Sequence, residues 1–145
     1  MLRRLRSLGT PGKELCTIYT TFILPTLMYA CPVWSSSLTL TQKQKLERVQ
    51  KRACRIILGS TYEGYDHALS TLNLPKLSDR HQEALRKFGD NLLTHPRHRH
   101  FLPPDAPPPR RTTRHVNKLV PIRAPRTDRY KNSAIPAIVN LINSA

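Results

Sequence analysis

Cationic side chains recur at helical spacing between Thr39 and Gly59, and their types suggest a chemistry. The segment holds six Lys or Arg side chains and one acid, Glu47. Clustered cations bind polyanions because they release counterions from phosphate groups. The pattern therefore predicts contact with nucleic-acid phosphates, and the alternative is the solvated charged face of an ordinary core helix. The candidate binding residues here are Lys43, Lys45, Arg48, Lys51, Arg52 and Arg55.

A second group of cations follows in a proline-rich segment, residues 96–133. This segment mixes ten Lys or Arg residues with only two acids, Asp105 and Asp128. It has too little apolar surface to offset the entropy lost on ordering, so we expect a basic and mostly extended tail. Its candidate phosphate-binding residues are Arg110, Arg111 and Arg114, with Arg97, Arg99 and Lys118 as further cations.

The side chains that could catalyse a reaction are scattered. Two-metal chemistry needs carboxylates that converge on the metals, and no two of the five aspartates are adjacent. His95, His98 and His100 have no cysteine nearby to complete a metal site. The three cysteines are odd in number and far apart, which disfavours a disulfide framework or a zinc site. We therefore expect no catalytic residue, metal, cofactor or small-molecule substrate.

Composition limits both the core and the partners. The chain has 145 residues, 39% hydrophobic content and a formal charge of +15, which predicts one modest core and polyanionic partners. The charge-free run from Leu15 to Trp34 is interrupted by Pro25 and Pro32, and its apolar residues follow one helical face. This favours packing against protein over membrane insertion. We expect an intracellular protein, nuclear or cytoplasmic, that binds RNA or DNA backbones; a small membrane-associated basic protein is the alternative.

The elements that position the cations are predicted to be helices, so the fold class is mainly α. A Thr-x-x-Gln pattern, at Thr39 and again at Thr41, marks a helix start, and Gly59 marks its end. We expect a second helix through residues 67–72 and a longer one that Ser78 caps and that ends at His95–Pro96.

These helices predict a bundle over residues 1–95, the basic tail over 96–133, and a short apolar helix over 134–145. The bundle should bury one shared apolar face. The residues predicted in its core are Tyr19, Phe22, Trp34, Leu46, Val49, Ile56, Leu85 and Phe88.

Four blocks in this order carry a family resemblance. They read LCTIYTTFILPTLMYACPVW, KLERVQKRACRIILG, ALSTLNLPKLSDRHQEALRKFGDNLL and RYKNSAIPAIVNLINSA. Together they resemble the region from the thumb to the C-terminus in jockey-like reverse transcriptases of non-LTR retrotransposons. The matching residues are Ile18, Tyr19, Ile23, Pro25, Leu27, Tyr29, Trp34, Leu46, Glu47, Gln50, Arg55 and Ile56.

The resemblance implies a thumb-like helical bundle that lies against a template–primer duplex in the parent RNA-directed DNA polymerase. The palm motif with paired aspartates that the family uses for catalysis does not occur in this sequence. The expected function is therefore that of a fragment of such an enzyme, with nonspecific nucleic-acid binding and no activity of its own. A host-adopted basic module for nucleic-acid binding or interaction is the other alternative.

The absence of paired carboxylates leads to a first prediction. The purified chain should not extend a primer on an RNA or DNA template with Mg²⁺ or Mn²⁺, because nothing in it predicts a site for two metals. A primer-extension assay tests this, and extended product that survives removal of contaminating polymerases would contradict it.

Overall fold

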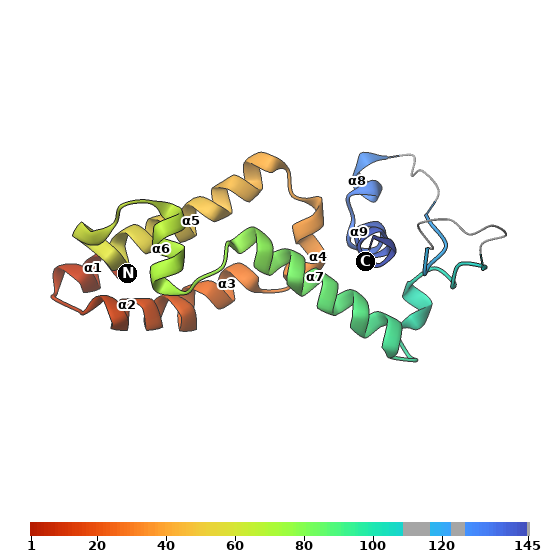
Figure 1. The fold of residues 1–145 in the computed structure, drawn as a ribbon, viewed down its shortest axis with the longest axis horizontal. Coiled ribbons are helices and arrows are strands. Elements are labelled where there is room, and N and C mark those ends of the chain that lie inside the picture. Colours follow the sequence, from red (N-terminus) through yellow and green to blue (C-terminus); the bar gives the residue numbers. More distant parts are fainter. Residues whose placement is uncertain (109–116, 123–126, 145) are drawn as a thin grey trace. The chain divides into compact units, whose positions relative to one another are not determined.

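The regular elements are helical throughout the part of the chain that the structure describes (Figure 1). The computed structural model describes residues 1–108, 117–122 and 127–144. The prediction of a mainly α fold is confirmed. The α-helices are α1 (Leu2–Ser7), α2 (Gly12–Ile18), α3 (Leu24–Met28), α4 (Cys31–Trp34), α5 (Leu40–Leu58), α6 (Tyr65–Leu72), α7 (Leu77–Thr94), α8 (Asp128–Lys131) and α9 (Ala134–Asn143). Shorter turns are the π-helical η1 (Tyr19–Ile23) and the 3₁₀ turns η2 (Ser35–Ser37), η3 (Gly59–Thr61) and η4 (Arg99–Phe101).

The chain forms two compact units, and their limits differ from the predicted domain boundaries. The first unit comprises Met1–Tyr29 and Thr39–Arg80, and the second comprises Ala30–Leu38 and His81–Ala145. A boundary near residue 95 was expected because the composition changes there. The compact units instead divide within α7, since Leu77 in its first turn packs in one apolar cluster and Leu85 and Leu92 pack in the other.

A π-helical turn changes which residues of the first helical run face the core. The turn η1 ends two residues before Pro25, whose missing N–H cannot bond to the carbonyl four residues before it. Tyr19 and then Leu24 are buried, five residues apart, whereas Phe22 is 68% exposed. The prediction of Phe22 in the core was therefore wrong, because it assumed uniform α-helical spacing.

The helix α5 begins and ends at the predicted residues. Thr39 and Gln42 form a reciprocal capping box, and the helix ends at Gly59, which has a positive φ of 59°. Its buried residues are Gln50, Ala53, Cys54 and Ile57. Val49, predicted in the core, is 43% exposed, so the inward face is turned by about one residue from the predicted stripe.

The second unit is built around the approach of α7 and α9. Leu85, Gly89 and Leu92 face inward from α7, and Gly89 lies so close to Ile138 that an added Cβ would be 2.7 Å from the Ile138 Cγ2 atom. Phe88, predicted in the core, is 38% exposed because the neighbouring glycine takes the contact position.

Several other predicted features of these helices can be compared with the structure. Leu85 and Tyr19 are buried as predicted, and Trp34, Leu46 and Ile56 are half-buried. The predicted cap residue Ser78 lies inside α7, which begins one residue earlier at Leu77. The helix ends at Thr94, directly before the predicted His95–Pro96 stop.

Part of the predicted extended tail packs in the second unit. Leu102 and Leu119 are buried, and an isolated antiparallel bridge joins Asp105 to Leu119. The Asn143 side chain accepts hydrogen bonds from the backbone N–H groups of Lys118 and Leu119, both at 3.0 Å. These leucines supply the apolar burial that the proline-rich composition did not suggest.

Within the described residues, no single helix has both the length and the apolar composition needed to cross a bilayer. By length and composition alone, the helical stretches Gly12–Met28 and Cys31–Ser37 together meet the requirements of a broken membrane span.

The close approach at Gly89 leads to a second prediction. Gly89→Ala should lower the free energy of unfolding by about 1 kcal/mol, because overpacking against Ile138 outweighs the gain in helix propensity. In an Ile138→Ala background the same change should instead raise it by about 0.5–1 kcal/mol, since only the propensity gain remains.

Urea denaturation followed by circular dichroism measures both values. Gly64→Ala is the control, because an added Cβ there meets nothing within 4 Å. If Gly89→Ala lowered the free energy of unfolding equally in the unsubstituted chain and in the Ile138→Ala background, the close approach of α7 and α9 would be contradicted.

Candidate nucleic-acid interface

The six cations of α5 all lie on exposed surface. Arg48, Arg52 and Arg55 project from the side of the helix opposite its buried residues, since successive side chains are about 100° apart around the axis. Lys45 and Lys51 flank them, and from Lys45 to Arg55 the helix rises about 15 Å. We call the five residues Lys45, Arg48, Lys51, Arg52 and Arg55 the basic ridge. Lys43 lies one turn from the helix start.

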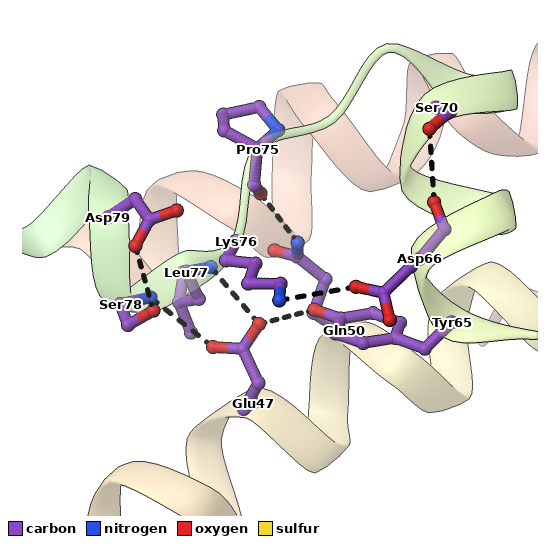
Figure 2. Close-up of polar contacts among 10 residues, drawn as sticks. All are labelled: Glu47, Gln50, Tyr65, Asp66, Ser70, Pro75, Lys76, Leu77, Ser78 and Asp79. Carbon is purple, nitrogen blue, oxygen red and sulfur yellow. Dashed lines mark hydrogen bonds and ion pairs between the residues drawn. The ribbon is translucent and has the colours of Figure 1, made fainter.

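The only acid of α5 does not lie on the basic ridge. The Glu47 carboxylate accepts hydrogen bonds from the backbone N–H groups of Leu77 and Ser78, both at 3.2 Å, and from the Tyr65 hydroxyl (Figure 2). The first two groups belong to the first turn of α7, where N–H groups lack helical partners and a negative charge is favoured. Glu47 therefore caps another helix, and its carboxylate is engaged by the first turn of α7 and by Tyr65.

Gln50 attaches the same helix to two further segments. It is only 1% exposed, and its Oε1 atom accepts a hydrogen bond of 2.9 Å from the Tyr19 hydroxyl. Its Nε2 atom donates to the backbone carbonyl of Pro75 at 2.8 Å, as Figure 2 shows. Burial raises the pKa of Tyr19, so this hydroxyl stays a donor at neutral pH. Both the oxygen and the nitrogen of the buried amide are hydrogen-bonded, and these bonds offset its loss of hydration.

Two tyrosines lie beside the basic ridge. The Arg55 guanidinium carbon lies 5.2 Å from the centre of the Tyr62 ring, and the Lys51 ammonium lies 5.9 Å from the centre of the Tyr65 ring. Both distances fall within the range of cation–π attraction. Both rings are half-buried and pack against the apolar core of the first unit, which we call the first apolar cluster.

The cations predicted in the tail are placed only in part. Arg110, Arg111 and Arg114 lie outside the described residues. Arg97 and Lys118 are exposed. Arg99 pairs with Asp105 at 2.8 Å and donates to the carbonyls of Leu102 and Pro103, so its guanidinium stabilises a local turn. Of the described tail cations, Arg99 is therefore engaged locally, whereas Arg97 and Lys118 lie on exposed surface.

The cysteines and histidines form no metal-binding cluster in the part of the chain that the structure describes. Cys31 and Cys54 are buried and Cys16 is half-buried, all three as free thiols. Burial raises the pKa of Cys54 to about 11, so its thiol stays protonated at neutral pH.

Sequence reasoning identified the ridge but missed the residues that shape it. Gln50 shares one helical face with Ala53, Cys54 and Ile57, at spacings of three, four and seven residues. A polar residue within such an apolar stripe is the signal of a buried amide. The run TYEGY begins at Thr61, shortly after the helix, and supplies two aromatic residues but no Lys or Arg. Only the fold places these rings beside cations of the basic ridge.

Comparison with family models, with curated proteins and with solved structures gave no match for this chain.

The contacts of Glu47 lead to a third prediction. Glu47→Ala should lower the free energy of unfolding by about 2–4 kcal/mol, because it leaves the Tyr65 hydroxyl and the Leu77 N–H without an acceptor. Glu83→Ala is the matched control, since Glu83 forms an exposed i, i+4 pair with Lys87 at 2.7 Å, and it should cost less than about 0.5 kcal/mol. Denaturant unfolding measures both, and similar losses would show that the Glu47 contacts are weak.

Proposed function

We propose that this chain is a sequence-independent nucleic-acid-binding segment, equivalent to the thumb-to-C-terminus region of a non-LTR retrotransposon reverse transcriptase. The observation that carries the binding proposal is the basic ridge, five exposed cations on one helix whose only acid is bound elsewhere. Phosphate groups are the ligands that such a row of cations fits best.

The polar network around α5 supports the family proposal. Tyr19, Gln50 and Pro75 come from three of the four sequence blocks that carry the resemblance, and they are joined through the Gln50 side chain. Glu47 adds contacts between the second block and the third, at Leu77 and Ser78. Because residues of different blocks bond to one another, we expect these blocks to occur together in one protein family.

The mode of binding follows from the type and arrangement of the side chains. The ridge extends about 15 Å, which corresponds to roughly four nucleotide steps of about 3.4 Å along a strand. Lys and Arg on a convex helix surface reach phosphates more readily than base edges, so the contacts should position the chain without reading sequence. The partner is thus an RNA or DNA backbone.

Salt dependence leads to a fourth prediction. Each phosphate neutralised contributes a slope of roughly −0.7 to −0.9 to the plot of log affinity against log salt concentration. Replacing Lys51, Arg52 and Arg55 by Ala should therefore flatten the slope by about two to three units. Fluorescence anisotropy with a labelled oligonucleotide at several salt concentrations measures it.

The matched control removes the same charge from exposed positions outside both α5 and the basic tail, as Arg3→Ala/Lys13→Ala/Arg86→Ala. It should change the slope by less than about one unit, because these residues lie outside the ridge. An unchanged slope in the α5 variant, with its helix content intact by circular dichroism, would show that the ridge is only a solvated face.

A further inference from the structure

We propose that Tyr62 and Tyr65 are positioning residues, which hold Arg55 and Lys51 ready for phosphate and make them the strongest binding cations of the ridge. This inference rests on the proposed nucleic-acid binding and names the side chains that carry it. The evidence is the pairing of each of these two cations with a tyrosine ring face.

The rings can position the cations because they are held in place themselves. Both tyrosines pack against the first apolar cluster, and the Tyr65 hydroxyl also donates to Glu47. Arg55 and Lys51 are exposed, so a phosphate can approach them while each cation stays over its ring face. A cation over an aromatic face keeps free N–H donors at its edge for a phosphate oxygen.

The other cations of α5 bind at a greater entropic cost. Lys43, Lys45, Arg48 and Arg52 are exposed and show no ring contact within the described residues. A long side chain that is free in solution loses rotamer freedom when it contacts phosphate, whereas a restrained one has already lost part of it. Equal charges should therefore contribute unequal affinity.

The hydroxyl of Tyr62 is not what holds Arg55. It is buried and has no hydrogen-bond partner among the described residues. The ring alone therefore does the positioning, which allows a sharp comparison. Tyr62→Phe keeps the ring face and removes only the unpaired hydroxyl, whereas Tyr62→Leu keeps apolar burial and removes the ring face.

The two variants lead to a fifth prediction, measured by anisotropy with a fluorescein-labelled oligothymidylate. Tyr62→Leu should weaken binding about two- to fivefold at fixed salt, as expected for loss of one exposed cation–π contact. The salt slope should stay unchanged, because no charge is removed. Tyr62→Phe should bind like the unsubstituted chain. Phe22→Leu, which removes an exposed ring far from the ridge in sequence, is the control and should also leave binding unchanged.

A comparison of cations tests the same inference without touching the rings. Arg55→Ala and Arg52→Ala should each flatten the salt slope by about 0.7–0.9, but Arg55→Ala should weaken binding more at fixed salt. In the Arg55→Ala background, Tyr62→Leu should cause no further loss, since the cation that it positions is gone.

The outcomes separate this inference from the proposed function. Equal losses for Arg55→Ala and Arg52→Ala, or equal binding by Tyr62→Leu and Tyr62→Phe, would overturn the positioning role and leave nucleic-acid binding in place. A full-length chain with no salt-dependent binding would overturn both. Circular dichroism of every variant shows whether it folds. If Tyr62→Leu does not fold, the comparison of Arg55→Ala with Arg52→Ala tests the positioning role.

Discussion

The first unit depends on two polar side chains that α5 turns toward the interior. Burying an amide or carboxylate without hydrogen bonds destabilises the fold by more than most single apolar contacts stabilise it. Each of these two side chains must therefore be hydrogen-bonded in the packed structure. Gln50 finds them in Tyr19 and Pro75, and Glu47 finds them in Tyr65 and the first turn of α7. Because these contacts point in fixed directions, they set the rotation of α5 about its own axis, which apolar packing alone leaves looser.

That rotation determines what the outer surface carries. With Gln50 inward, the residues about half a turn away face outward, and these are arginines and lysines. The same rotation brings Lys51 and Arg55 beside the two tyrosines that follow η3. One set of hydrogen bonds thus stabilises the fold, engages the acid of α5 and places cations next to rings. The structural role of Glu47 and the proposed binding role of the ridge are two consequences of one helix orientation.

The second unit shows a different constraint, which is the lack of a side chain. Gly89 lets α9 approach α7 closely enough for Ile138 to fill the space that a Cβ would take. Leu102 and Leu119, from a segment rich in proline and arginine, complete the same apolar cluster. Asn143 closes it by bonding to the backbone on both sides of Leu119 with its amide. A few apolar residues and one amide side chain therefore hold part of the segment that composition predicts to be an extended tail.

The sequence by itself determined the elements that local chemistry controls. The Thr39–Gln42 capping box, the glycine after α5 and the His95–Pro96 stop place the helix ends, and the excess of Lys and Arg identifies the cationic helix. Only the tertiary structure decided which face of each helix lies inward. Val49 and Phe88 were predicted inside because periodicity counts hydrophobicity alone, which ranks them above a glutamine or a glycine. Phe22 was predicted inside because uniform α-helical spacing was assumed, whereas a π-helical turn changes that spacing. The partners that bury Gln50 lie 31 and 25 residues away in the chain, and the atom that requires Gly89 is on another helix. The local sequence does not say which distant residues supply these contacts.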